Sequence, residues 1–383
     1  MIDTKFTQEN TKFQQPHVVS LLVVGASLAA AGCSAGVDPA EEMSDQVSQA
    51  VCASGTFYGS DTLKPAVQTV SIAPTYPTYL GTGSGVGEQG LLGSGACGPN
   101  QQVVAPMSRD LGSSLSCKAG TDDLKSKRVA IDGILVTTAT TNAATDVTAA
   151  ELGRLFCAGG AGAAPTPCSL PQTLAGGQQI SRVYRRDDAS GTTDTFLSIL
   201  NGAVGCSSLC DDANHVIVTD TSHPTDCPSL TATQCIGRLT RDNVGAGGNF
   251  ALGYAGLSAL TINPDPKVLT VSSVDPVASS FANVRNFSYL FSRYVYANYN
   301  RSALHNGAFA TSSTSVQANE KAFLCEFVLG PSDPDCAGHP DSRQVFENAL
   351  VGADFLACDV TPPLVPLNCN PNGPTPPGPV SCP

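Results

Sequence analysis

The chain has 383 residues, of which 42% are hydrophobic and 14% are charged. This composition allows a large buried core and excludes an intrinsically disordered polypeptide. The net charge of −12 argues against a nucleic-acid-binding protein, because such proteins need a concentrated basic face. It does not exclude a small anion, which backbone N–H groups, hydroxyls and a guanidinium attract at hydrogen-bonding distance.

The N-terminal segment has the pattern of a lipoprotein export signal. Lys5 and Lys12 precede an apolar run over 18–31, and the small residues 30–32 stand directly before Cys33. The run is too short to span a bilayer comfortably. An ordinary secretory signal or membrane anchor with a coincidental cysteine is the alternative. We predict a signal peptide over 1–32, lipid attachment at Cys33, a flexible tether over 33–50, and an exported cell-envelope protein on the periplasmic side or outer surface.

Cysteine usage also indicates export, because 15 cysteines would be unusual in a reducing cytosol. Without Cys33, 14 remain (15 − 1), an even number that predicts seven disulfides. No C-x-x-C pair occurs, the closest local pair is Cys206 and Cys210, and only five histidines are present. A structural zinc site is therefore disfavoured, and we predict no metal and no cofactor.

Between the two ends, short β-like runs alternate with helix-like runs, which predicts an α/β fold. The segment Val129–Val136 is apolar and rich in β-branched residues, as a strand buried on both faces would be. The segment Asp146–Phe156 predicts a helix capped by Asp146 or Thr148. Residues 361–383 form a Pro-rich tail that contains Cys369 and Cys382.

The segment Val183–Leu200 carries the strongest candidate for a binding site. A predicted strand delivers Arg185 and Arg186, a turn follows at 189–191, and a helix begins near Thr192. Free N–H groups at the helix start, the hydroxyls of the turn and a guanidinium together make an anion site. Asp188 is placed to hold the arginine side chain. The alternative is an ordinary capped helix with a surface arginine.

Two more turns repeat this chemistry. Gly59–Pro65 and Gly81–Gly90 are rich in glycine and hydroxyl residues, and each precedes a helix-like run. Hydrolase chemistry is not indicated, because the sequence has no G-x-S-x-G motif and its histidines stand alone. We therefore predict no enzyme and no catalytic residues.

The order of these segments resembles that of the periplasmic phosphate-binding proteins, the substrate-binding proteins of phosphate-specific ABC transporters. The matching segments run in order from about residue 55 to 300, and the Arg-x-x-x-Ser-Gly-Thr element is the strongest. They are Gly59–Leu63, Gly83–Gly85, Val104–Arg109, Val129–Gly133, Val147–Phe156, Arg186–Thr192 and Leu252–Gly256.

The resemblance implies a type II (Venus-flytrap) periplasmic-binding-protein fold with a two-strand hinge. Lobe I would combine 51–133 with 284–360, and lobe II would be 134–283. The phosphate-binding residues implied by the family are Thr62, Leu63, Ser84, Arg186, Ser190, Gly191 and Thr192. The family also implies a monomer that binds inorganic phosphate or a related oxyanion and delivers it to an ABC permease, with a membrane anchor through its lipid.

One position departs from the family pattern. Where phosphate binders place an Asp that accepts the ligand's proton, this chain has Arg109 followed by Asp110, and Asp61 is another candidate acceptor. Such an acceptor rejects sulfate, which has no proton to donate. Two other functions remain open on the same fold: a disulfide-rich surface or adhesive protein, and a phosphatase-like enzyme.

Overall fold

The computed structural model describes the parts of the chain that build and surround the candidate site. They are residues 56–72, 76–92, 102–111, 124–176, 178–219, 222–223, 225–244, 249–262, 264–272, 276–277, 281–301, 314–353 and 355–357. All lie in the unit Ser48–Pro383. The predicted signal peptide, Cys33, tether and Pro-rich tail lie outside the described residues. Among the residues described, no helix is long and apolar enough to cross a membrane.

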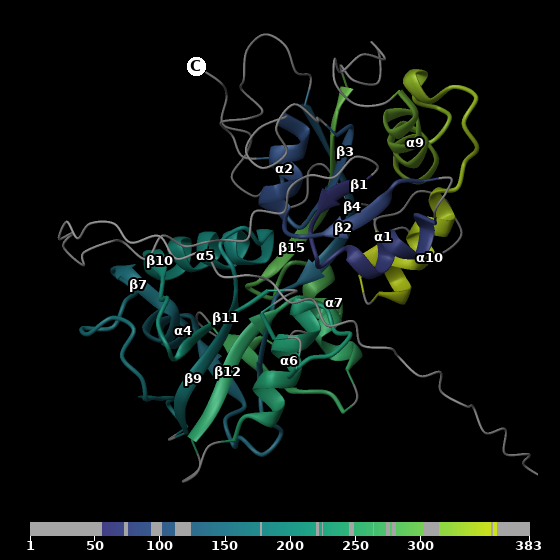
Figure 1. The fold of residues 1–383 in the computed structure, drawn as a ribbon. Helices are drawn as coiled ribbons and strands as arrows, with labels where there is room; N and C mark the ends of the chain where they lie inside the picture. Colours follow the sequence, from purple (N-terminus) through teal and green to yellow (C-terminus); the bar gives the residue numbers. More distant parts are fainter. Residues whose placement is uncertain are drawn as a thin grey trace, which may run out of the picture. The chain divides into compact units, whose positions relative to one another are not determined.

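One half of the described structure is built on an antiparallel four-stranded sheet in the order β16-β4-β15-β3. Beside it, β1 and β2 form a parallel pair. Helices α1, α2, α9 and α10 lie around these strands (Figure 1). The bounds are β1 Thr56–Gly59, α1 Lys64–Val70, β2 Thr78–Gly81, α2 Ser84–Leu92, β3 Val104–Met107, β4 Leu124–Gly133, β15 Ser292–Asn300, α9 Thr314–Leu324, a π-helical turn Cys325–Leu329, a 3₁₀ turn Pro334–Cys336, α10 Arg343–Gly352 and β16 Leu356–Ala357. We call this the four-stranded half.

The other half is built on an eight-stranded mixed sheet whose main path is β11-β9-β12-β5-β13-β14, with β6 beside β13 and β8 beside β9. Helices α4, α5 and α6 accompany it (Figure 1). The bounds are β5 Leu135–Thr138, β6 Asp146–Thr148, α4 Ala149–Phe156, β7 Cys157–Gly160, β8 Gln172–Thr173, β9 Gln179–Arg186, α5 Gly191–Val204, β10 Cys206–Leu209, β11 His215–Val218, α6 Ala232–Asp242, β12 Asn249–Ala255, a 3₁₀ turn Leu257–Thr261, β13 Lys267–Ser272, β14 Pro276–Val277 and α7 Phe281–Arg285. We call this the eight-stranded half.

The chain passes between the halves at two adjacent places. β4 continues through Ile134 into β5, and the chain returns through α7 into β15. The two passages touch, because the Ile134 N–H donates to the Phe291 carbonyl at 3.0 Å. The predicted α/β fold is confirmed, with two sheets joined by two crossings. The predicted lobe boundaries remain a prediction.

Local sequence explains how the elements near the crossings form. The predicted helix at 146–156 begins at Ala149, because Thr148 caps it and forms a capping box with Glu151. Its last residue, Phe156, contributes to an aromatic core in which the rings of Phe196 and Tyr254 stack at 3.9 Å. This core packs under α5 and fixes the position of its first turn.

Four disulfides lie within the described residues: Cys157–Cys206, Cys168–Cys210, Cys227–Cys235 and Cys325–Cys336. The first two tie the segment after α4 to the segment after α5. The six other cysteines, apart from Cys33, lie outside the described residues, so complete pairing stays a prediction. They are Cys52, Cys97, Cys117, Cys358, Cys369 and Cys382.

Candidate anion-binding site

The first turn of α5 faces the four-stranded half. Ser190 is the N-cap, and its hydroxyl accepts a hydrogen bond from the Thr192 N–H at 3.2 Å. Like any α-helix, α5 leaves its first N–H groups without intrahelical partners. Gly191 begins the helix where a Cβ would lie 2.5 Å from the Ser84 Oγ and 2.6 Å from the Ser108 Oγ. Glycine is therefore required for the two halves to approach so closely.

Buried hydroxyl groups from the four-stranded half meet this turn. Thr62 follows β1, and its Oγ1 lies 3.1 Å from the Thr192 Oγ1. The Ser108 Oγ lies 3.1 Å from both the Ser60 Oγ and the Ser84 Oγ. All five side chains are buried. The structure thus brings the three predicted glycine- and hydroxyl-rich turns together, as their shared chemistry suggested.

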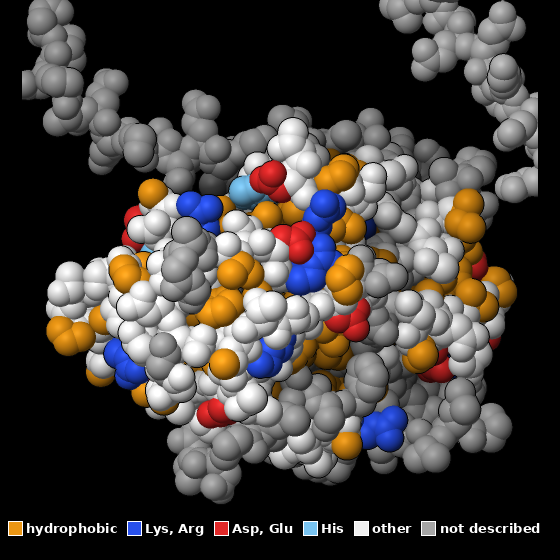
Figure 2. Space-filling view, turned by 90° about the horizontal axis from the view of Figure 1, so that it is seen from below, with side chains coloured by type: hydrophobic (Ala, Val, Ile, Leu, Met, Phe, Trp, Pro, Cys, Tyr) orange, Lys and Arg blue, Asp and Glu red, His pale blue; other side chains and the backbone are white. Residues whose placement is uncertain are grey.

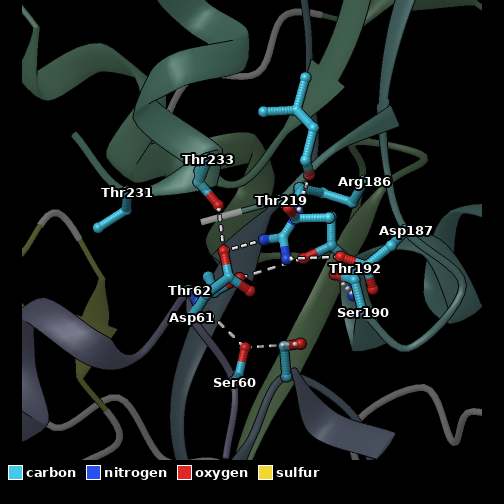
Figure 3. Close-up of polar contacts among 12 residues, drawn as sticks. Ser60, Asp61, Thr62, Arg186, Asp187, Ser190, Thr192, Thr219, Thr231 and Thr233 are labelled. Carbon is cyan, nitrogen blue, oxygen red and sulfur yellow. Dashed lines mark hydrogen bonds and ion pairs between the residues drawn. The ribbon is translucent and has the colours of Figure 1, made fainter. Parts of the chain in front are cut away.

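Arg186 lies at the end of β9 and faces Asp61 of the four-stranded half (Figure 3). Its Nη1 forms an ion pair with the Asp61 Oδ2, its Nη2 lies 3.3 Å from the Asp187 Oδ2, and its Nε donates to the Val218 carbonyl at 3.0 Å. Arg186 and Asp61 are each only 1% exposed. A guanidinium this deeply buried requires charged partners, because desolvation of an unpaired charge is costly.

Thr233 completes the surroundings of Asp61. It lies in the first turn of α6, and its hydroxyl donates to the Asp61 Oδ2 at 3.0 Å (Figure 3). The other carboxylate oxygen of Asp61, Oδ1, is buried and has no hydrogen-bond partner among the described residues. Sequence reasoning missed Thr233, because no local signal distinguishes it from an ordinary helix-start threonine.

A second buried guanidinium supports the α5 turn from the crossing strand β15. Arg293 pairs with Asp132 of β4, with Nη2 at 2.5 Å and Nε at 2.9 Å from the same Oδ2. Its Nη2 also donates to the Thr192 Oγ1 at 3.0 Å. Arg293 was not predicted from the sequence, and it holds the Thr192 hydroxyl in place from the point where the chain changes sheets.

Leu63, whose backbone N–H is a predicted donor, follows Thr62 in the chain. It is the N-cap residue of α1 and is fully buried. Arg109 and Asp110, two of the predicted specificity residues, directly follow Ser108 in the chain. Arg109 pairs with Glu88 of α2 and, at 2.6 Å, with Asp194 of α5. Asp110 accepts from the Leu111 N–H at 2.7 Å and is exposed.

Asp188 holds Arg185 rather than Arg186, at 2.7 Å. Its side chain is 77% exposed, which leaves Asp61 and Asp187 as the carboxylates that contact Arg186.

Two protonation states are shifted near the site. Burial raises the pKa of Asp194, and its ion pair with Arg109 opposes the shift. Burial also raises the pKa of Tyr254 to about 12, so its phenol is neutral where it contacts the Thr193 hydroxyl at 2.8 Å. Tyr254 therefore stabilises the first turn of α5 as a neutral hydrogen-bonding group.

The arrangement offers donors and buried charge, which suits binding. Within the described ranges, no group of three or more His, Cys, Asp and Glu residues could hold a metal ion. The described histidines contact other parts of the protein: His215 the Leu155 carbonyl, His223 Asp226 and His339 Glu326. None of them is placed to act as a base for the site's hydroxyls.

Neither a protein-family model nor a curated protein sequence matches the chain. Solved structures do match. A Clostridium perfringens protein, solved with bound phosphate and assigned to the substrate-binding proteins of phosphate ABC transporters, is 20% identical with a TM-score of 0.49, over 80% of this chain and 100% of its own.

An ABC-type phosphate transport receptor from Vibrio cholerae is 17% identical with a TM-score of 0.47, over 79% of this chain and 98% of its own. A phosphate-binding protein from Stenotrophomonas maltophilia is 15% identical with a TM-score of 0.47, over 79% and 90%. The solved structures to which this chain is similar thus include phosphate-binding proteins of the kind that the sequence resembles.

Proposed function

We propose that this protein is an extracytoplasmic solute-binding lipoprotein. It captures inorganic phosphate or a related oxyanion between its two halves and delivers the anion to an ABC-type permease. It performs no chemistry on the ligand. The observation that carries the proposal is the meeting of Asp61 and Thr62 from one half with Arg186, Ser190 and Thr192 from the other.

The proposed mechanism is closure of the two halves around the anion. An anion at the start of α5 would receive hydrogen bonds from the helix-start N–H groups, the surrounding hydroxyls and Arg186. Donors from both halves contribute, so bound anion stabilises the closed arrangement more than an open one. A permease that recognises the closed form would then distinguish loaded from empty protein.

The face shown in Figure 2 carries charged side chains of both signs. Acidic and basic side chains are interspersed there, so the net charge of −12 is not gathered into one acidic region on that face. Exposed charges farther than about 10 Å from an anion are largely screened by salt, so the net charge adds little long-range repulsion.

Titration of the purified full-length protein with inorganic phosphate tests the proposal. We expect saturable binding of one phosphate per molecule and a higher melting temperature at saturating phosphate, because a ligand that binds only the folded state stabilises it. Chloride at the same ionic strength is the control. Absence of both the binding heat and the stabilisation would remove the proposed function.

Lipid attachment is tested separately at Cys33. Changing Cys33→Ser is expected to release protein from membranes into the soluble fraction, because the acylated thiol is lost. The measurement is fractionation of cells that export the chain, together with mass spectrometry of the mature N-terminus. A membrane-bound C33S protein, or a mature form that begins elsewhere, would contradict lipid attachment at Cys33 without affecting the binding proposal.

A further inference from the structure

The guanidinium of Arg186 lies between two carboxylates, and each carboxylate has one buried oxygen without a partner. Asp61 and Asp187 contact different terminal nitrogens of Arg186 through their Oδ2 atoms. Among the described residues, both Oδ1 atoms are buried and accept no hydrogen bond. An acceptor left unsatisfied inside a protein is destabilising, and more so when it is charged. The structure therefore holds two acceptors that a ligand can satisfy.

The net charge of these side chains favours a ligand of low negative charge. With both carboxylates ionised, Arg186, Asp61 and Asp187 sum to −1 (one positive and two negative groups). The neighbouring pair Arg293 and Asp132 sums to zero. Sulfate would meet two carboxylates with no proton to give them, and the hydrogen phosphate dianion has one proton for two acceptors. An anion of single charge that carries two hydroxyl groups meets less repulsion and can donate to both.

We infer that the site selects a singly charged oxyanion with two protons, and that Asp61 and Asp187 are the residues that accept them. For phosphate this is the dihydrogen form. The inference rests on the proposed function and specifies its ligand. The remaining oxygens of the anion would accept from the α5 turn, where Ser190 and Thr192 lie beside Asp187 (Figure 3).

The charged groups around this pair come from several elements. Arg186 and the Arg185–Asp188 pair come from β9 and the turn after it, and the Arg293–Asp132 pair comes from β15 and β4. Lys64 of α1 lies near the Asp61 backbone, and α6 contributes the neutral Thr233.

The Arg109–Asp194–Glu88 group joins α2 to the first turn of α5. The described histidines are engaged elsewhere, as shown above. Because burial raises the pKa of Glu320 in α9 to about 8, the titration is also made with Glu320→Gln. A change of affinity between pH 5.5 and 8.5 that persists in this variant reports the second ionisation of phosphate.

Calorimetric titration with inorganic phosphate at pH 5.5, 7 and 8.5, at constant ionic strength, tests the inference. Binding should weaken about tenfold for each pH unit above the second ionisation of phosphate, because the competent form decreases by that factor. Sulfate should not compete at any of the three pH values. Phosphate affinity that stays level or rises toward pH 8.5 would overturn the inference while leaving the proposed function intact. No phosphate binding at any pH would overturn both.

Two variants assign the effect to these residues. Asp187→Asn and Asp61→Asn replace an acceptor by an amide that can donate to a dianion. Each should flatten the pH dependence and give measurable sulfate binding. Asp187→Asn is the safer variant, because the Asp187 side chain is 19% exposed whereas that of Asp61 is 0% exposed. Asp242→Asn, in an exposed pair with Arg241 on α6, is the matched control. An unchanged pH profile in D187N, with a normal melting temperature, would exclude Asp187 as an acceptor.

Discussion

Arg186→Ala is expected to abolish or greatly weaken phosphate binding. The substitution removes the charged donor of the site and leaves Asp61 and Asp187 without their guanidinium. Removing one partner of a buried charge pair costs about 3–5 kcal/mol, and loss of a charged contact to a buried ligand group costs about 2–5 kcal/mol. Affinity should therefore fall by about thirtyfold to a few thousandfold, since each 1.4 kcal/mol is a factor of ten. Calorimetry and the phosphate-dependent melting temperature measure the loss.

Three variants define the specificity of this effect. Arg241→Ala removes an arginine on α6 that pairs with the neighbouring Asp242 and should bind phosphate normally. Ser190→Ala and Thr192→Ala each remove one neutral hydroxyl and should cost about 1–3 kcal/mol. Near-normal affinity in R186A would show that another group, such as the adjacent Arg185, binds the anion.

A second large effect is expected far from the site, at Glu320 of α9. Glu320 is 2% exposed, its Oε2 accepts from the Val103 N–H, and burial raises its pKa to about 8 while backbone hydrogen bonds oppose the shift. A carboxyl whose folded-state pKa is raised contributes stability below its unfolded pKa and loses it as pH rises through the folded value. The free energy of unfolding should fall by up to about 5 kcal/mol between pH 4.5 and 9 from this group.

Glu320→Gln tests this expectation because glutamine stays neutral at every pH. Urea unfolding at pH 5, 7 and 9 should show E320Q gaining stability relative to the parent protein as pH rises. Glu347→Gln, at a partly exposed position on α10, is the control and should shift stability by a constant amount. A parent-minus-E320Q difference that does not change with pH would rule out a buried, protonated Glu320.

The part of the site that the sequence could predict is the part encoded in short segments. Arg186, Ser190, Gly191 and Thr192 follow one another through a strand, a turn and a helix start, and local rules for helix caps and anion binding apply to them directly. The turns with Thr62 and Ser84 carry the same chemistry, so their convergence on α5 could be anticipated. The α/β fold could be predicted for a similar reason, because it follows from alternating local patterns.

The contacts that the sequence could not predict join residues far apart in the chain. Thr233 reaches Asp61 across 172 positions, and Arg293 reaches Asp132 across 161. Neither residue has unusual neighbours in the sequence. Arg109 was expected to affect ligand choice because it stands near a family position, but only the fold reveals that its partners are Glu88 and Asp194.

The Arg109 ion pairs bear on how firmly the two halves are held together, which is a different property from the choice of anion. Glu88 and Arg109 belong to the four-stranded half and Asp194 to the eight-stranded half, so one guanidinium spans the junction. Its partners Glu88 and Asp194 are different carboxylates from Asp61 and Asp187, which pair with Arg186. We therefore expect its contribution to the proposed closed arrangement to be similar for different anions. We expect substitutions at this position to lengthen or shorten the residence time of the proposed ligand and to make its release sensitive to salt, because ion pairs across the junction are screened by ions.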